Sequence, residues 1–340
     1  MAGYRENFLQ LSSFFTKVIP GKSLFSRKDI PLVHVFYHTV ADHTPPHIQH
    51  LYPVKSIGSF KKDLDFILEH FVPLDIKDFK PGIKQKNGKP FFILSFDDGL
   101  REFSDVISPI LLEKGVPATC FLNPEFVGNK GLFFRYKASL LVDHVLGNRI
   151  QPEVQDWNSW VGDLNVKGSF EASLLNLGYD RRQVLDFVAQ KLELSFSDYL
   201  EKKRPYLDEM QIRSLIAKGF TFGAHSLDHP EYRFLEQVEQ IRQTKDSVDW
   251  VVEKFSLPYR YFAFPFTDFQ VSNTFFEQVQ REEIAEMTFG GAGLKYDSVD
   301  FHHQRIPMEV GRLSAEEILK GEMLYYNFKA LFGKNTLTRE

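Results

Sequence analysis

Residues 91–99 constrain the fold most, because an apolar run is followed there directly by two acidic side chains. The run 91–96 has the length and the apolar content of a strand buried on both faces, as in a parallel sheet. Asp97 and Asp98 follow at once, and Gly99 permits a sharp turn. Two interpretations stay open: acids placed for chemistry at the carboxyl end of a parallel strand, or side chains that cap the next helix.

Short apolar runs alternate with amphipathic segments along most of the chain. Strand, helix and strand within about thirty residues form a βαβ unit, and this rhythm returns several times. Strands are expected at 32–38, 72–76, 91–96, 117–122, 220–225 and 261–264 and near Met287 and Gln304, and helices at 59–70 (capped by Ser59), 103–114, 208–218, 235–255, 272–283 and 314–331. The alternation predicts a parallel α/β barrel.

Residues 131–204 break this rhythm, since they contain several helix-like pieces together with Trp157 and Trp160. We interpret them as a helical insertion on a βα loop, where such barrels carry specificity elements. The alternative is that the insertion only packs on the barrel or on a second subunit. The expected domains are therefore an N-terminal helical extension at 1–30, a barrel at 31–130 and 205–332, and the insertion at 131–204.

Composition excludes several classes of protein. A hydrophobic share of 43% and a charged share of 25% are those of a soluble globular protein, and a net charge of −4 gives no reason to expect nucleic acid as a partner. The single cysteine, Cys120, lies in an apolar run and forms no internal disulfide. Neither a signal peptide nor an apolar run of transmembrane length is found. We expect a cytoplasmic protein, unless a leader has been removed.

A second polar cluster, His225 and His229, follows the apolar run 220–224. Pro230 disfavours helical geometry at His229, so the two histidines belong to a turn at a strand end. The four-residue spacing is weak evidence by itself, and the location at a strand end gives it weight. One carboxylate and two imidazoles with open positions for water suit Zn²⁺ or another first-row divalent ion. A neighbouring acid is then free to act as a base on that water.

These residues carry a family resemblance. Ser-Phe-Asp-Asp-Gly at 95–99 and His-Ser-Leu-Asp-His at 225–229 resemble, in this order, the first two motifs of the polysaccharide deacetylases, the NodB-homology domain of carbohydrate esterase family 4. The resemblance covers roughly residues 30–125 and 205–310. It implies a distorted (β/α) barrel and the metal-dependent removal of an acyl group from a sugar. By matching motifs it implies that Asp97 is the general base and that the metal ligands are Asp98, His225 and His229.

The third motif departs from the family pattern. The family shows Arg-x-Pro-aromatic, in which the arginine orients the base and the aromatic residue's backbone N–H binds the oxyanion. This sequence has Ala-Phe-Pro-Phe, with Ala263 at the arginine position and Phe266 at the aromatic one. The Phe266 amide can still serve as an oxyanion donor. Arg305 is our candidate for the missing charge, and the alternative for Arg305 is a surface salt bridge.

The C-terminal Leu-x-His that carries the general acid in the family is also absent. Some members resemble a circular permutation in which that strand comes first and reads Tyr-His, and Tyr37-His38 fits this arrangement. His38 is therefore the predicted general acid. His302 and His303 are rivals, although adjacent histidines on a loop are more often solvated than catalytic.

The predicted function is a metal-dependent hydrolase that removes an N-acetyl or other small acyl group from a carbohydrate, with zinc as the expected metal. An acetylated carbohydrate is the expected partner, and a lipid-linked or soluble sugar precursor is favoured over a wall polymer. Trp157 or Trp160 would stack on a sugar ring. Two alternatives stay open. One is a glycan-binding relative without catalysis, and the other is a deformylase or amidohydrolase that acts on a non-sugar amide.

Overall fold

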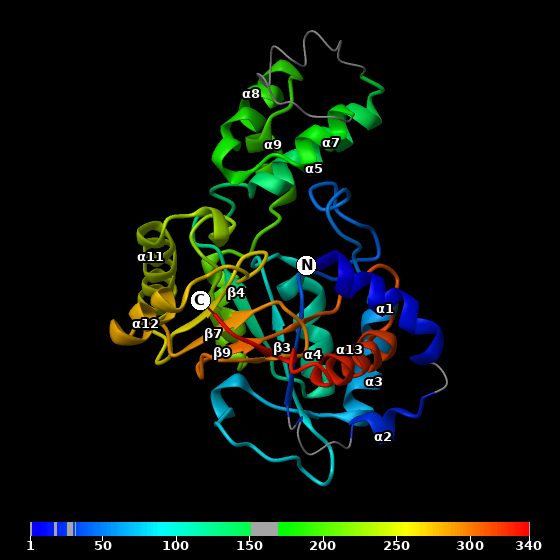
Figure 1. Cartoon of the computed structure of the whole chain (residues 1–340). Helices are drawn as coiled ribbons and strands as arrows, with labels where there is room; N and C mark the ends of the chain where they lie inside the picture. Colours follow the sequence, from blue (N-terminus) through cyan, green and yellow to red (C-terminus); the bar gives the residue numbers. More distant parts are fainter. Residues whose placement is uncertain (1, 17–18, 26–29, 31, 151–168, 340) are drawn as a thin grey trace.

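The computed structural model describes residues 2–16, 19–25, 30, 32–150 and 169–339. At its centre is a sheet of parallel strands in the order β10-β1-β3-β4-β5-β6-β7-β9, with β2 paired to β3 (Figure 1). These strands are β1 (Leu32–Tyr37), β2 (Val72–Pro73), β3 (Phe91–Phe96), β4 (Thr119–Leu122), β5 (Thr221–Ala224), β6 (Tyr261–Ala263), β7 (Met287–Gly290), β9 (His302–Gln304) and β10 (Ile306–Pro307). A separate pair joins β8 (Tyr296–Asp297) to β11 (Thr336–Leu337) near the C-terminus.

The sheet closes on itself at one residue. β9 and β10 are consecutive in the chain with only Arg305 between them, and they pair with β7 and β1, the strands at the two ends of the remaining sheet. The strands therefore form a nearly closed barrel, and the predicted parallel α/β barrel is confirmed. Its interior is filled by apolar side chains that include Ile93, Phe121 and Phe289.

Helices cover the outside of the barrel. They are α3 (Ile57–His70), α4 (Ser108–Lys114), α10 (Glu209–Ala217), α11 (Gln237–Phe255), α12 (Asn273–Arg281) and α13 (Ala315–Ala330), and α4 is preceded by a π-helical turn, η2 (Phe103–Ile107). The predicted cap of α3 is wrong: Ser56, not Ser59, accepts the hydrogen bond from the Ser59 amide. Ile57 packs against the core, which makes the helix begin before Ser59.

The N-terminal helices α1 (Ala2–Thr16) and α2 (Gly21–Phe25) lie against α13 and α3 (Figure 1). Leu9 of α1 is fully buried, and Gly321 permits the close approach of α13, since a Cβ there would lie 2.7 Å from a Leu9 methyl carbon. A buried ion pair, Arg5 with Glu322, also joins the two helices. Within the described ranges, no helix has the length and apolar character needed to cross a membrane.

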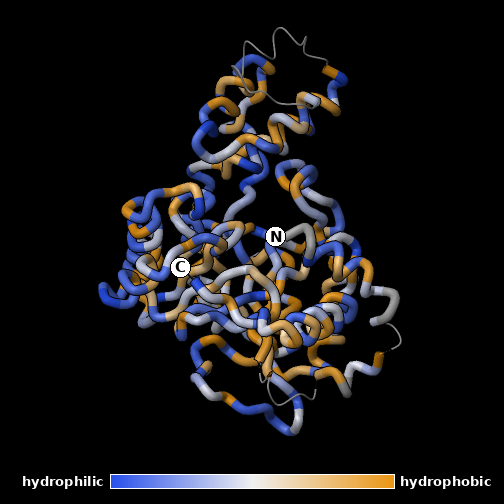
Figure 2. The backbone as a smooth tube through the Cα atoms, viewed as in Figure 1, coloured by the Kyte–Doolittle hydropathy of each residue, from blue (hydrophilic) through white to orange (hydrophobic). Residues whose placement is uncertain are grey.

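A second group of helices stands beside the barrel (Figure 1). These are α5 (Phe134–Gly147), α7 (Phe170–Leu175), α8 (Gln183–Lys191) and α9 (Phe196–Lys203), which share their own hydrophobic cluster. Figure 2 shows apolar and polar positions intermixed along them, as expected for helices with one buried face. Trp157 and Trp160 lie outside the described residues, and the division of the chain into three predicted parts stays a prediction.

Candidate active site

Both acids of the first motif lie at the carboxyl end of β3 and are buried. The Asp97 amide donates to the Tyr37 carbonyl at 3.0 Å, which continues the β1–β3 register and sets His38 beside Asp97. Gly99 turns the chain with φ +60°, and a Cβ there would lie 2.7 Å from a Leu122 methyl carbon. The motif therefore needs glycine for both conformation and space.

Several residues around this position have strained backbone. Asp98, Ser226, His229 and Phe266 all have φ between +55° and +70°, a region that non-glycine residues rarely adopt. Each such residue costs about 1–3 kcal/mol, and such residues cluster at functional sites. Part of this cost is offset locally, because the Ser226 hydroxyl accepts a hydrogen bond from the His229 amide at 3.1 Å. Three separate turns thus hold side chains in position at one end of the barrel.

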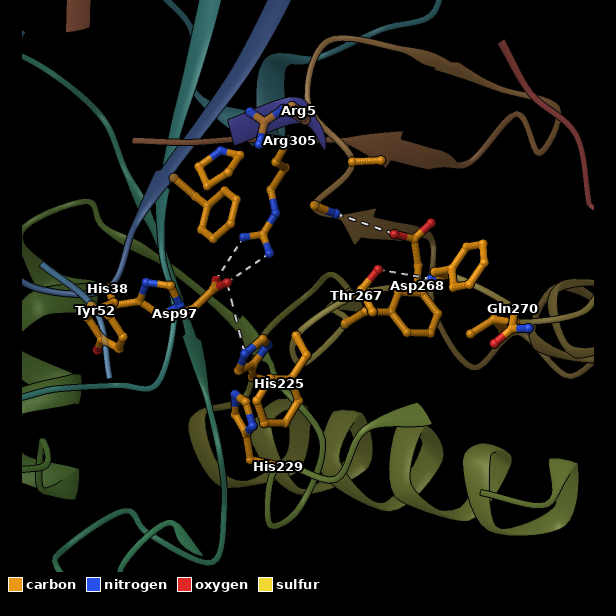
Figure 3. A pocket seen from close by; sticks show the side chains of 18 of the residues that line it. Arg5, His38, Tyr52, Asp97, His225, His229, Thr267, Asp268, Gln270 and Arg305 are labelled. Carbon is orange, nitrogen blue, oxygen red and sulfur yellow. Dashed lines mark hydrogen bonds and ion pairs between the residues drawn. The ribbon is translucent and has the colours of Figure 1, made fainter. Parts of the chain in front are cut away.

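Asp98, His225 and His229, which we call the Asp98 cluster, offer ligand atoms that all lie within 4.8 Å of one another. Oδ1 of Asp98 is 3.6 Å from Nε2 of His225 and 3.2 Å from Nε2 of His229. The Nδ1 atom of His225 lies 2.8 Å from the Ala263 carbonyl, so it is the protonated nitrogen and Nε2 presents a lone pair. Figure 3 shows both imidazoles on the side of the cavity that holds Asp97.

The protonation states in the Asp98 cluster suit a cation. Burial lowers the pKa of His225 to about 4, so its ring is neutral at neutral pH. Burial alone would raise the pKa of Asp98, but the neighbouring histidines outweigh it and keep this carboxyl ionised. Oδ1 of Asp98 is buried without a hydrogen-bond donor. Two imidazole nitrogens and one carboxylate oxygen that converge in this way suit zinc or another first-row divalent metal.

Arg305 reaches from the barrel seam to Asp97. Its two terminal nitrogens donate to the two carboxylate oxygens at 2.7 and 2.8 Å, and both side chains are 2% exposed (Figure 3). Its guanidinium carbon also lies 4.2 Å from the centre of the Phe36 ring. Burial favours the neutral acid, but Arg305 outweighs burial and lowers the pKa of Asp97. The alternative of a surface salt bridge for Arg305 is excluded by its burial.

His38 follows β1 and pairs with Glu309, a residue that sequence reasoning missed. Nδ1 of His38 lies 2.5 Å from Oε2 of Glu309, which also accepts from the His38 amide. Burial disfavours the imidazolium, but the charge and hydrogen bond of Glu309, helped by both motif acids, raise the pKa of His38 to about 9. The histidine therefore carries a proton at neutral pH. Glu309 comes two residues after β10, and an acid just past a strand end was the available signal.

The rival histidines lie elsewhere. His302 and His303 belong to β9, not to a loop as predicted, because the chain pairs there with β7. His303 stacks on His34 with 5.4 Å between ring centres, and His302 is 2% exposed beside Asp268. Neither of them lines the cavity that contains His38.

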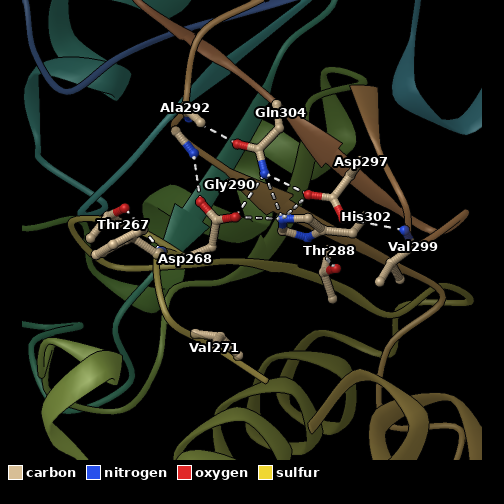
Figure 4. Close-up of polar contacts among 12 residues, drawn as sticks. Thr267, Asp268, Val271, Thr288, Gly290, Ala292, Asp297, Val299, His302 and Gln304 are labelled. Carbon is tan, nitrogen blue, oxygen red and sulfur yellow. Dashed lines mark hydrogen bonds and ion pairs between the residues drawn. The ribbon is translucent and has the colours of Figure 1, made fainter. Parts of the chain in front are cut away.

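A second cluster of ligand-type side chains surrounds His302. Asp268, Asp297 and His302, which we call the Asp268 cluster, also lie within 4.8 Å of one another. Here the carboxylates have donors: Nη2 of Arg339 lies 2.5 Å from Asp268 and 2.6 Å from Asp297. Gln304 donates to both acids as well, and Nε2 of His302 lies 3.1 Å from Asp268 (Figure 4). Arginine fills the place that a metal would need.

One cavity of about 1220 Å³ joins the reactive groups. Phe266 is 43% exposed at its wall, and its amide has no acceptor among the described residues. The predicted insertion contributes Phe133, Arg135, Leu175 and Asn176 to the lining. From the same segment, the Tyr136 hydroxyl donates to Oδ2 of Asp98 at 2.6 Å. Sequence reasoning missed Tyr136, because a tyrosine within a helical segment carries no local signal of this contact.

The fold is shared with solved deacetylases. The deacetylase PplD of Streptococcus pyogenes, solved with acetate, and IcaB from Ammonifex degensii each align with a TM-score of 0.52 at 14% identity, over 86% of this chain and 97% of theirs. BC0361, a polysaccharide deacetylase from Bacillus cereus, aligns with a TM-score of 0.51 at 11% identity, over 86% of this chain and 68% of its own. At these identities the likeness concerns the fold alone.

The sequence comparisons give the family. None of the curated proteins searched matches the chain. The family model described as polysaccharide deacetylase matches residues 84–283, which include the Asp98 cluster, Asp97 and Phe266 but neither His38 nor Arg305. This match spans more than half of the 340 residues. As the two motifs predicted, the chain belongs to the polysaccharide deacetylase family.

Proposed function

We propose that this protein is a metal-dependent hydrolase that cleaves the C–N bond of an N-acetyl or other small acyl group on a carbohydrate. The observation that carries the proposal is one cavity that holds three kinds of group together. These are an ionised carboxylate paired with arginine (Asp97), three converging metal-type ligands (the Asp98 cluster) and a protonated histidine (His38). Amide hydrolysis needs a base, a means of polarising the carbonyl and an acid for the leaving amine.

Asp98, His225 and His229 are proposed to hold the metal, with zinc as the first choice. Such an ion polarises the acyl carbonyl and lowers the pKa of a water. Tyr136 orients Asp98 through its hydroxyl, and the Ala263 carbonyl orients His225. Partners of this kind keep ligands in the correct tautomer and position before an ion arrives.

Asp97 is proposed to be the general base that accepts the proton of the attacking water. Arg305 keeps this carboxylate ionised and fixes the plane of its two oxygens. Arg305 lies between β9 and β10, where the barrel closes, and is proposed to replace the arginine missing at Ala263. Its loss from the third motif is therefore compensated by a residue 42 positions later in the sequence.

Phe266 and His38 are proposed to stabilise the oxyanion and to protonate the leaving amine, respectively. The Phe266 amide is proposed to donate to the oxyanion that develops on the acyl oxygen. His38 is proposed to give its proton to the nitrogen as the C–N bond breaks, because an amine is a poor leaving group unless it is protonated. Glu309 stabilises the imidazolium until that step.

The cavity favours a saccharide over a small amide. Its volume of about 1220 Å³ far exceeds that of an acetyl group, and Phe266 and Phe269 expose 43% and 39% of their surface. Exposed aromatic faces suit the apolar side of a sugar ring. A glycan-binding role without catalysis would not need the buried Asp97–Arg305 pair beside the protonated His38.

Acetate release from a panel of N-acetylated oligosaccharides by the metal-loaded protein tests the proposal. We expect equal amounts of acetate and free amine, released roughly 10²–10⁴-fold more slowly by Asp97→Asn. Binding of these sugars without acetate release would identify the glycan-binding alternative. Release only from formylated or acetylated amides that lack a sugar would identify the amidohydrolase alternative.

A further inference from the structure

The cavity continues beyond the reactive groups into a part that the family match does not cover. Arg5 of α1, Tyr325 and Lys329 of α13, Lys295 from the loop after β7, and Arg339 line this part, which we call the outer cleft. All of them lie outside residues 84–283. Whatever the outer cleft recognises is therefore a property of this chain rather than of the matched region.

Two lysines of the outer cleft lack an acidic partner. Lys295 and Lys329 are both partly buried, and neither forms an ion pair with a carboxylate among the described residues. Nζ of Lys329 instead lies 5.2 Å from the centre of the Tyr325 ring. Burial, and then the nearby charge of Lys329, lower the pKa of Lys295. The two cations thus repel each other in a partly desolvated place, and a bound anion would relieve this repulsion.

Arg5 adds a donor to the same place. It is 9% exposed, and its Nε donates to Oε1 of Glu322 at 2.6 Å. The other oxygen of Glu322 accepts from the Leu294 amide at 2.7 Å. Nη2 of Arg5 is buried with no hydrogen-bond partner. A buried donor without an acceptor is costly unless a ligand supplies one.

The acids near the outer cleft offset its positive charge only in part. Glu322 and Asp268 act to raise the pKa of Lys295, but they are paired with Arg5 and Arg339, and Glu6 of α1 is exposed to solvent. The loop that carries Lys295 is also held tightly, because a Cβ on Gly293 would lie 2.5 Å from both Arg5 and Glu322 side-chain atoms. Packing against Arg5 and Glu322 therefore fixes the position of the loop that carries Lys295.

We propose that the outer cleft is an anion subsite, which binds a phosphoryl or carboxylate group carried by the acylated saccharide. This proposal rests on the proposed deacetylase function and names its substrate class. The Gly293 amide donates to the Arg305 carbonyl at 3.0 Å, and Lys295 follows two residues later, within about 7 Å of extended chain. Asp97, Lys295 and Lys329 line the same cavity, so one ligand bound in it can extend from the reactive groups to the two lysines.

Binding to the inactive Asp97→Asn variant tests the subsite without turnover. The ligands are the methyl glycosides of N-acetylglucosamine and N-acetylgalactosamine, the corresponding 1-phosphates, and a disaccharide of N-acetylglucosamine and glucuronic acid. Calorimetry compares this variant with one that also carries Lys295→Gln and Lys329→Gln. A matched control carries Lys202→Gln and Lys203→Gln instead, on the exposed face of α9.

We expect an anionic ligand to bind at least about tenfold more tightly than its neutral counterpart. The Lys295/Lys329 change should remove this advantage, and the Lys202/Lys203 change should not. Whether a phosphate or the uronate shows it identifies the source of the charge. Equal affinity for charged and neutral ligands, an advantage that survives the Lys295/Lys329 change, or no binding of any anionic ligand would overturn the proposal.

Acetate release by the otherwise unaltered enzyme from the same ligands separates this proposal from the deacetylase proposal. Lysine-dependent binding without any release contradicts the deacetylase proposal alone. If charged and neutral ligands release acetate at equal rates, and the Lys295/Lys329 change leaves these rates equal, the anion subsite alone is contradicted.

Discussion

The Asp98 cluster and the Asp268 cluster both combine aspartate and histidine side chains whose ligand atoms lie within 4.8 Å of one another, yet their surroundings differ. In the Asp268 cluster, Arg339 and Gln304 supply donors to both carboxylates. In the Asp98 cluster, one carboxylate oxygen is buried without a donor, and a neutral imidazole turns its lone pair toward it. The comparison teaches that ligand type and spacing do not define a metal site. The protons and cations around the ligands decide whether an ion is needed.

The largest expected effect distinguishes Asp97, beside the Asp98 cluster, from Asp297, a member of the Asp268 cluster. Asp97→Asn should lower turnover by roughly 10²–10⁴-fold while metal content is unchanged, because Asp97 is proposed to be a base and not a ligand. Asp297→Asn in the Asp268 cluster should lower stability and leave turnover largely intact. Steady-state kinetics and metal analysis of both variants check this. An Asp97→Asn protein that purifies without metal would mean that the roles of Asp97 and Asp98 have been exchanged.

Arg339→Ala removes the cation that fills the Asp268 cluster. Breaking a buried ion pair by removing one partner costs about 3–5 kcal/mol, and we expect a loss of this size in the free energy of unfolding measured in urea. If occupation by Arg339 is what distinguishes the Asp268 cluster from the Asp98 cluster, zinc added to Arg339→Ala should recover part of the lost free energy of unfolding. Arg312→Ala, at an exposed position, is the control. Unchanged stability would show that Arg339 does not fill the Asp268 cluster.

A histidine paired with an acid lies near the Asp98 cluster (His38 with Glu309) and another within the Asp268 cluster (His302 with Asp268), and only His38 should appear in the pH dependence of the rate. Activity needs protonated His38, so the rate should fall as pH rises through about 9. Glu309→Gln should move this fall toward pH 6.5. At pH 8 an imidazole of ordinary pKa keeps its proton in roughly 3% of molecules, so we expect a loss of roughly 30-fold.

His38→Ala should abolish this limb of the profile while fold and metal content are kept. A limb that persists in His38→Ala but vanishes when His302 and His303 are both replaced by alanine would assign the general acid to β9. The proposal of a permuted general-acid strand would then be wrong.

A smaller effect is expected from Tyr136→Phe. Burial and the charge of Asp98 raise the pKa of Tyr136, so its hydroxyl keeps its proton and donates to Oδ2 of Asp98. Losing such a partner typically weakens metal binding by about 10–100-fold. Competition with a chelator measures the change. Tyr199→Phe, which loses a hydroxyl bonded to His47, is the control. Equal metal affinity in the two variants would mean that Tyr136 does not orient the ligand.

The sequence predicts much of the barrel and the residues at its strand ends. Short apolar runs mark the strands, and a polar residue just after such a run lies at the carboxyl end of a parallel sheet. Asp97, Asp98 and His225 are found in this way. Arg305 is proposed because the third motif has Ala263 where the family has an arginine. The structure brings Arg305 to Asp97 because barrel closure joins β10 to β1.

The missed residues depend on long-range packing. Glu309 reaches His38 across 271 positions only when the barrel closes, and Tyr136 reaches Asp98 only through the orientation of α5. Arg339 lies two residues after the short strand β11, and no sequence pattern there indicates its partners. Ser56 and Ser59 are equally good caps in sequence, and the packing of Ile57 decides between them. These contacts follow from tertiary structure and leave no periodic pattern in the nearby sequence.

Metal content per chain tests the central claim most directly. The protein is purified without chelator, and metal is counted in the unaltered chain, in His225→Ala/His229→Ala and in Asp268→Asn/Asp297→Asn. We predict one divalent ion per chain in the unaltered protein, none in the histidine variant and one in the Asp268 cluster variant. An ion that survives the loss of both histidines, or that disappears with Asp268 and Asp297, would contradict the assignment of the metal site to the Asp98 cluster.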